Sequence, residues 1–287
     1  MEKIKLLVDS GSNIDLETAK KYNIGILPFK VHIGEKTYTD LYDLTIDEFF
    51  QKIKTSDEKI STSIPGPGEF MEKVNKYIDQ GYNKILCLAI DSSLSGMHQM
   101  MTMVAKEISE KRKVQIDVAD TKTACLPIYY LATNAGQKII DGKSYQTIYD
   151  ELMEEIEKTK VLVKVDTLDY LAKGGRLPKA IALMANVVSF KPVLTLKNGK
   201  IKIVKKAMGK KKSLSAFIEN IKILAKDKKN YYFALAGGDD KEELEKIKES
   251  LKEEIQGAKI FKDLKIPPVF GVHLGPGSLV ASLFEIE

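Results

Sequence analysis

Short apolar runs alternate with amphipathic stretches through the first half of the chain. The runs at 4–10, 84–90 and 114–120 are each followed by a loop rich in Ser, Thr and Asp, and then by apolar residues at helical spacing. Apolar strands that alternate with amphipathic helices are typical of a parallel sheet covered on both faces. The pattern therefore predicts an α/β fold whose ligands lie at the carboxyl ends of the strands, where these loops fall.

The pattern changes from about residue 161. Two apolar segments separated by Lys-Asn-Gly at 197–199 predict a β-hairpin, because Asn-Gly is the strongest short hairpin signal. Around it we expect a strand at 161–166, an almost wholly apolar helix at 178–190, an amphipathic helix at 213–226, a strand at 231–237, a charged helix at 240–255 and a closing segment at 277–287. We therefore predict two α/β domains that meet near residue 160: residues 1–160 with a parallel sheet and residues 161–287 with a mixed sheet.

The composition is that of a globular protein with a real core. Hydrophobic residues make up 44% of the 287, no run of about 18 apolar residues occurs, and the first residues are charged rather than typical of a signal peptide. We therefore expect a cytoplasmic protein without stable membrane insertion. Cys87 and Cys125 lie in apolar stretches without a CxxC partner, so they predict core residues rather than a disulfide framework or a zinc site.

The net charge of +5 is a small excess on a chain in which 30% of the residues are charged. Only Arg112 and Arg176 are arginines, and the dense basic run at 205–213 contains no aromatic residue. Nucleic-acid readers normally place arginines and stacking aromatics on one face. The charge therefore indicates a solvated surface and no nucleic-acid partner.

The segment STSIPGPGEF at 61–70 places three hydroxyl side chains before a predicted helix. Pro67 suits the first helical turn, and Ser61, Thr62 and Ser63 precede it. A helix N-terminus stabilises an acidic group by about 0.3–1 kcal/mol through its dipole. Taken alone, however, the three hydroxyls are explained as well by ordinary helix capping.

Similar hydroxyl-bearing loops recur at 9–13, 91–95 and 120–123. If they share one edge of the sheet, they form a basin of neutral hydrogen-bond donors. A phosphate site would bring Lys or Arg and more glycine. The nearest matches to nucleotide loops, at 136–144 and 275–278, depart from the Walker and GxGxxG spacings. The basin therefore suits a carboxylate better than a nucleotide.

The sequence contains no pattern for a serine nucleophile or a metal site. It has no GxSxG elbow, its three histidines are His32, His98 and His273, and none of them has metal-ligand spacing. His273 stands between Gly271 and Gly275, where small residues let a ligand come close. We therefore expect His273 to contact a ligand rather than to act as the base of a catalytic triad.

Apolar segments adjoin the hydroxyl loops. Four methionines at 97–103 follow the loop at 91–95, where they form either an adaptable cavity wall or plain core. Together with the apolar helix at 178–190 they would suit a carboxylic acid with a long hydrocarbon tail. Each buried methylene contributes about 0.8 kcal/mol, so a long acyl chain supplies on the order of 10 kcal/mol before costs, far more than its head group.

Seven segments, in order and over essentially the whole chain, resemble the DegV family: VDSGSNI, STSIPGPGEF, DSSLSGMHQ, DTKTA, TLDYLAKGGRLPKA, KPVLTLKNGKI and GVHLGPGSL. This family includes the FakB-type fatty-acid-binding subunits of bacterial fatty acid kinase. The resemblance implies two α/β domains with a long-chain fatty acid buried between them as the ligand and no cofactor. It also implies a carrier rather than an enzyme, because a separate kinase subunit supplies ATP and phosphorylates the bound carboxylate for phospholipid synthesis.

The matching motifs allow site residues to be carried over. The resemblance implies that five residues bind the fatty-acid carboxylate: Thr62, Ser63, Ser92, Ser95 and His273. It implies that Arg176, in the GGR motif, lies near the site opening and helps to present the acyl group to the kinase.

The chain departs from the family pattern at several positions. Ile64 and Gly66 stand where Gln and Ser are common, and Asp91 stands where Ser is common. Because a carboxylate at position 91 would repel an acidic ligand, we expect Asp91 to point away from it or to be hydrogen-bonded elsewhere. In the basic run, Met208 and Lys210 stand among positions that usually carry arginines, and lysine does not reproduce the planar fork of arginine. The resemblance to the family therefore rests on more matching residues for the fatty-acid ligand than for the kinase partner.

Two alternatives come from other classes of protein. A small-molecule phosphoryl or acyl transferase using the same cleft would need a nucleotide or metal site, for which the sequence shows no motif. A regulatory interaction module, with lipid as incidental filler, would bind its partner whether or not it carried lipid.

Overall fold

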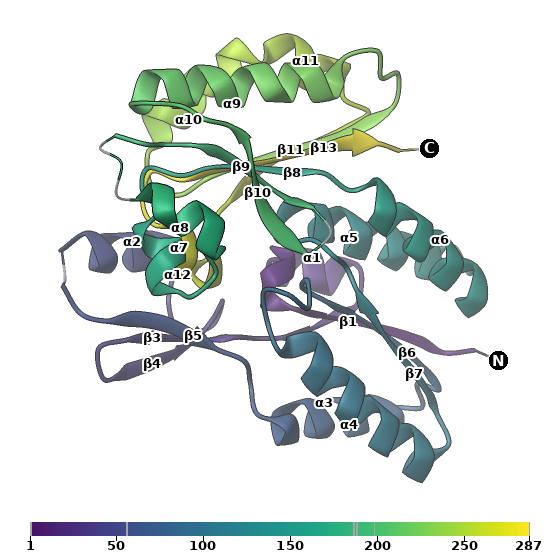
Figure 1. The fold of residues 1–287 in the computed structure, drawn as a ribbon. Helices are drawn as coiled ribbons and strands as arrows, with labels where there is room; N and C mark the ends of the chain where they lie inside the picture. Colours follow the sequence, from purple (N-terminus) through teal and green to yellow (C-terminus); the bar gives the residue numbers. More distant parts are fainter. Residues whose placement is uncertain (1, 56, 186, 188, 198, 287) are drawn as a thin grey trace.

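The computed structural model describes residues 2–55, 57–185, 187, 189–197 and 199–286. Within these residues the strands form three sheets, with helices between and outside the two larger ones (Figure 1). The strands are β1 (Ile4–Asp9), β2 (Ile24–Leu27), β3 (Lys30–Ile33), β4 (Lys36–Thr39), β5 (Ile60–Ser63), β6 (Lys84–Ala89), β7 (Gln115–Asp120), β8 (Val161–Lys164), β9 (Val193–Lys197), β10 (Lys200–Lys205), β11 (Tyr231–Gly237), β12 (Ile260–Lys265) and β13 (Leu279–Glu285). The helices are α1 (Leu16–Lys21), α2 (Ile46–Thr55), α3 (Pro67–Asp79), α4 (Met97–Arg112), α5 (Leu126–Ile140), α6 (Tyr145–Lys158), α7 (Asp169–Lys173), α8 (Lys179–Ala185), α9 (Lys210–Ala225), α10 (Lys241–Ser250), α11 (Lys252–Gly257) and α12 (Pro268–Leu274), with a 3-10 turn η1 (Ser10–Ser12).

In the described part of the first half, the first sheet consists of four parallel strands in the order β2-β1-β6-β7. All residues of β1 are buried, as expected for a parallel strand covered on both faces. Helix α4 packs against β6 and β7, whereas α5 packs against β1 from the opposite face (Figure 1). The parallel sheet predicted from the apolar runs is therefore confirmed.

The second sheet is mixed and is built from strands of the second half, in the order β10-β9-β8-β13-β11-β12. Strands β11 and β12 pair in parallel, and the other neighbours pair antiparallel. Helix α9 covers one face, while α5 contacts β11 and β13 on the other. On that face Tyr130 of α5 packs against Tyr232 and Phe284. Helix α5 therefore lies between the two larger sheets and joins them, which confirms the predicted α/β fold.

The third, antiparallel sheet, β4-β3-β5, was not predicted. Its edge strand β5 contains the hydroxyl residues at 61–63, for which the sequence predicts a loop before a helix. Helix α3 does begin at Pro67, with Gly66 as its N-cap, but it starts only after β5 has ended. Because side chains alternate along a strand, the three hydroxyls point to two different faces.

The predicted hairpin is confirmed, because β9 and β10 pair antiparallel and Gly199 has a φ of +65°. Asn198 of its turn lies outside the described residues. The charged helix expected at 240–255 is divided into α10 and α11 at Leu251, whose φ of −112° is not helical.

The apolar helix expected at 178–190 is shorter and less buried than predicted. Helix α8 ends at Ala185, and residues 186 and 188 lie outside the described residues. Leu183 is 84% exposed and Val187 46% exposed. The apolar composition of this stretch, which has no clear periodicity, predicts a buried helix, but the structure leaves these side chains exposed.

Candidate functional site

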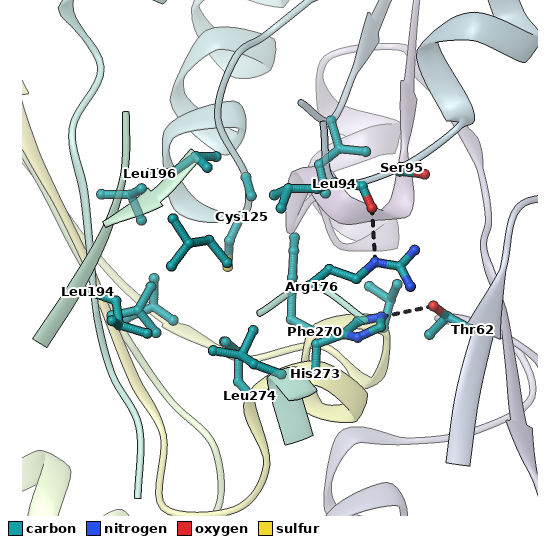
Figure 2. Close-up of a pocket in the computed structure, with 18 of the residues that line it drawn as sticks. Thr62, Leu94, Ser95, Cys125, Arg176, Leu194, Leu196, Phe270, His273 and Leu274 are labelled. Atoms are coloured by element: carbon teal, nitrogen blue, oxygen red, sulfur yellow. Dashed lines mark hydrogen bonds between the residues drawn. The ribbon is translucent and has the colours of Figure 1, made fainter. Parts of the chain in front are cut away.

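A cavity of about 110 Å³, partly open to solvent, lies between the first and second sheets. Its walls come from both halves of the chain: β5 and the loops after β6 and β7 on one side, and β8, β9, β13, α7 and α12 on the other (Figure 2). Most of the lining is apolar, and the polar exceptions are Thr62, Ser95, Arg176, Thr195 and His273. Thr195 already donates its hydroxyl to the carbonyl of Val161, at 2.7 Å.

Thr62 and His273 meet at one end of the cavity. Thr62 lies on β5, and His273 lies in the last turn of α12, 211 residues further along the chain. Thr62 Oγ1 and His273 Nε2 are 2.9 Å apart (Figure 2). When Nε2 carries the proton it donates to Thr62 Oγ1, and the hydroxyl hydrogen of Thr62 is then available to a ligand.

The imidazole of His273 is neutral at physiological pH. Its pKa is lowered to about 4, mainly by burial and in addition by the nearby charge of Arg176. Its Nδ1 is buried and has no hydrogen-bond partner among the described residues. Gly174 lies beside it, since a Cβ added there would be 2.3 Å from Nδ1. His273 therefore provides a neutral hydrogen-bonding group, not a positive charge.

Arg176 brings the positive charge. It follows α7 and lines the cavity. Its Nε donates to the carbonyl of Leu94 at 3.1 Å, and Nη1 donates to the carbonyl of Gly174 at 2.6 Å. Because Leu94 belongs to the loop after β6, this side chain also joins the two halves of the chain at the polar end of the cavity.

Ser95 lies in the same loop and lines the same end. Its Oγ accepts the N–H of Met97, the first residue of α4, at 3.2 Å. The hydroxyl hydrogen is then free to point at a ligand. Figure 2 shows Thr62, Arg176 and His273 grouped on one side of the cavity, and Leu194 and Leu196 on the side away from them.

Two residues predicted for the carboxylate site do not line the cavity. Ser63 points to the opposite face of β5 from Thr62, and its Oγ lies 2.9 Å from His32 Nε2. Ser92 is exposed, and its N–H donates to Asp120 Oδ1 at 3.2 Å. The strand period separates Ser63 from Thr62, and the turn after β6 directs Ser92 away from the cavity, so neighbours in sequence face different environments.

Asp91 is buried and turned away from the cavity, as expected. Its Oδ1 accepts the N–H of Ser93 at 2.7 Å, within its own turn. It does not line the cavity, so its carboxylate does not face a ligand there.

Of the two alternatives for the methionines at 97–103, a cavity wall or plain core, the structure favours core. Met97, Met100 and Met101 are core residues with exposures of 0%, 6% and 0%, and Met103 is 62% exposed. None of them lines the cavity, and neither does α8. The apolar wall instead comes from β8, β9, β13 and α12, which sequence reasoning missed. The alternation along β9 was a usable signal, because it places Leu194 and Leu196 on one face.

Neither a metal cluster nor a membrane-crossing helix is found in the described ranges. No group of three or more His, Cys, Asp or Glu side chains among these residues is arranged to hold a metal ion. No helix formed by these residues is long and apolar enough to span a membrane.

The comparisons with known proteins agree over the whole chain. The model of the DegV family, described as "Uncharacterised protein, DegV family", matches residues 3–285. A DegV domain-containing protein of Clostridium acetobutylicum is 28% identical over 286 residues, which are 99% of this chain and 100% of that protein.

Two solved structures are similar in both sequence and fold. DegV of Bacillus subtilis, described as a fatty acid binding protein, is 26% identical with a TM-score of 0.87, and the match covers 100% of both chains. A fatty acid binding DegV family protein of Streptococcus agalactiae is also 26% identical, with a TM-score of 0.89 and the same coverage.

Proposed function

Since this chain belongs to the DegV family, we propose that it binds a long-chain fatty acid in the cavity between its two larger sheets. The observation that carries the proposal is the division of the cavity lining. Apart from Thr195, whose hydroxyl is already bonded, the polar side chains gather at one end, and the rest of the lining is apolar. Such a site suits an amphiphile with a single acidic head group.

The carboxylate would lie at the polar end. Thr62 and Ser95 each have a hydroxyl hydrogen to donate, and Arg176 adds the positive charge. His273 supports Thr62 by donating to its oxygen, so that the Thr62 hydroxyl points outward. Hydrogen bonds to a charged acceptor each contribute roughly 1.5–3 kcal/mol, so the head group gives the ligand its direction.

The hydrocarbon tail would run along the apolar wall and supply most of the affinity. Leu194 and Leu196 of β9 and Phe270 of α12 belong to this wall. Each methylene buried there contributes about 0.8 kcal/mol. The fatty acid binding proteins of B. subtilis and S. agalactiae, which share this fold over the full chain, support the same assignment.

The decisive experiment is lipid extraction and mass spectrometry of the purified protein, followed by titration of the delipidated protein with palmitate and oleate. We expect a bound acyl chain, and a weakening of roughly tenfold in Thr62→Val and in Ser95→Ala, because each loses one hydrogen bond to a charged group. Ser63→Ala is the matched control and should bind like the wild type, since Ser63 faces the other side of β5. A delipidated protein that binds neither fatty acid would exclude the proposed function.

We further propose that the protein is a carrier that presents the fatty acid to a separate kinase. Arg176 lies at the polar end, where a kinase would have to reach the carboxylate. The test is incubation of the loaded protein with ATP and Mg²⁺, alone and with a bacterial fatty acid kinase catalytic subunit. We expect acyl phosphate only when the kinase is present. Acyl phosphate formed by the isolated chain would instead identify a phosphoryl transferase.

A further inference from the structure

Two segments of the second half deliver side chains to the polar end of the cavity. Residues 166–176 carry Arg176, and residues 268–278 carry His273. Both side chains must be held in place for either to meet one ligand head group. The fold places a fully buried lysine, Lys164, at the point where the two segments meet.

The segment that carries His273 is held by its backbone just after α12. Gly277 donates its N–H to Asp239 Oδ1 at 2.7 Å and accepts from Lys164 Nζ at 3.1 Å. Ser278 donates its hydroxyl to the carbonyl of Leu274 at 2.8 Å. The end of α12, and with it the direction of His273, is therefore set by the turn at Gly275–Gly277.

The segment that carries Arg176 is held by the same ammonium group. Lys164 Nζ donates to Asp166 Oδ1 at 2.7 Å, and Asp166 lies against the turn, because a Cβ on Gly277 would be 2.6 Å from Asp166 Oδ2. A third bond runs from Lys164 Nζ to Glu243 Oε2 at 3.1 Å. All three donors of the ammonium group are used, so its position is fully defined.

Burying this charge is not needed for stability alone. A buried ion pair costs several kcal/mol in desolvation, and apolar replacements of similar volume are often as stable or more so. The three bonds of Lys164 instead join the two segments that supply the cavity with His273 and Arg176. We propose that Lys164 is a positioning residue, which fixes His273 and Arg176 relative to each other at the head-group end of the cavity. This proposal rests on the proposed fatty-acid function.

The test uses the full chain with Lys164→Met and Glu243→Gln together, which removes the buried positive charge without leaving Glu243 ionised. We expect palmitate to bind roughly tenfold more weakly, as for the loss of a hydrogen bond to a charged group. We also expect Thr62→Val to cause a smaller loss in this background than in the wild type, because His273 would no longer be aligned with Thr62.

The ring ¹⁵N shifts of His273 in ligand-free protein give an independent readout, since a merely structural lysine would leave them unchanged. Lys5→Met is the matched control. Lys5 is another buried lysine, at 6% exposure, with bonds to the carbonyl and side-chain oxygens of Asn23, and it does not line the cavity. This variant should lose stability but keep the wild-type affinity and the wild-type His273 shifts.

The outcomes separate the two proposals. Wild-type affinity together with wild-type His273 shifts in the double variant would overturn the positioning role of Lys164. Absence of palmitate binding by the wild type would instead overturn the proposed function, while the His273 shifts would still test whether Lys164 positions His273. Should the double variant fail to fold, Ser278→Ala removes the hydrogen bonds to the carbonyls of Leu274 and Gly275 without touching a charge. It should weaken palmitate binding, and an unchanged affinity would count against the proposal.

Discussion

Gly174 lies against the imidazole of His273, and this contact is sensitive to a single methyl group. A Cβ at Gly174 would be 2.3 Å from Nδ1 and 3.0 Å from Cε1 of His273. The φ of Gly174 is −74°, so alanine suits the backbone conformation, and the added Cβ would also be 3.0 Å from the carbonyl oxygen of Tyr170. The ring must therefore shift away from Thr62 if a side chain is introduced.

We expect Gly174→Ala to weaken fatty-acid binding several-fold while the protein remains folded. The measurement is palmitate titration together with urea unfolding. Gly68→Ala is the control, since a Cβ at Gly68 meets nothing within 4 Å. Equal affinities for the two variants would show that the position of His273 does not matter for binding.

Asp9 is a buried carboxyl group at the end of β1. Its pKa is raised to about 7: burial is the main cause, the N–H groups of Ile90 and Gly11 act against it, and the charge of Asp40 acts with it. The folded protein therefore holds this proton up to about pH 7, whereas the unfolded chain releases it near the ordinary pKa of 3.8. Between these values the folded state binds more protons, so the contribution of Asp9 to stability is present at low pH and is lost as pH rises.

We expect the stability of the wild type relative to Asp9→Asn to fall by roughly a few kcal/mol between pH 4 and pH 8. Urea unfolding of both proteins across this range measures the difference. Asp40, whose pKa burial also raises, to about 6, is present in both proteins, so its effect largely cancels. Parallel stability curves for the two proteins would show that Asp9 is not protonated in the folded state.

At the scale of elements, the β9–β10 hairpin covers the cavity and also touches the opposite wall. Leu194, Leu196 and Ile201 of the hairpin line the cavity. At its turn, a Cβ on Gly199 would be 3.3 Å from the Cβ of Ser93, in the loop that also carries Ser95. The hairpin therefore packs closely against the hydroxyl-bearing loop of the first half.

We expect Gly199→Ala to destabilise the protein by more than Gly142→Ala and to weaken fatty-acid binding. Both glycines have positive φ, +65° and +75°, so both substitutions cost about 1–2 kcal/mol in backbone strain. Only Gly199 has neighbours within 4 Å of the added Cβ, so any further loss measures the contact with Ser93. Thermal unfolding and palmitate titration report the two effects, and equal losses would mean that the hairpin contact has no role.

At the scale of the whole molecule, the cavity lies where the two halves of the chain meet. Helix α5 joins the first and second sheets, and Cys125, the residue before it, lines the cavity. A ligand held between the halves contacts both of them, so its binding free energy adds to the free energy of unfolding.

We expect palmitate at 100 times its Kd to raise the free energy of unfolding by about 2.7 kcal/mol. Thermal unfolding of delipidated protein, with and without palmitate, measures the effect. Palmitate methyl ester is the matched control, because it keeps the tail but lacks the carboxylate, and it should stabilise the protein less. The same shift with acid and ester would show that the polar end does not recognise the head group.

The sequence by itself determined the elements whose pattern is local. The mainly apolar runs became β1, β6 and β11, the Lys-Asn-Gly turn became the β9–β10 hairpin, and Pro67 began α3. Such features depend on backbone preferences and on periods of 2 or 3.6 residues, which neighbouring residues encode directly. The ordered motifs also identified the family, since seven weak matches in sequence order are far more specific than any one of them.

The tertiary structure alone decided which residues share the cavity. Thr62 faces His273 while Ser63 faces away, and the buried methionines of α4 lie in the core. Leu194 belongs to the apolar wall of the cavity, for which the sequence indicates other residues. Sequence spacing does not determine which side chains of an edge strand face the cavity when the strand itself is not predicted. Nor does it determine how two residues 211 positions apart approach each other. These contacts result from the packing of two sheets around α5, and the free energy of that packing is spread over the whole core rather than over any local segment.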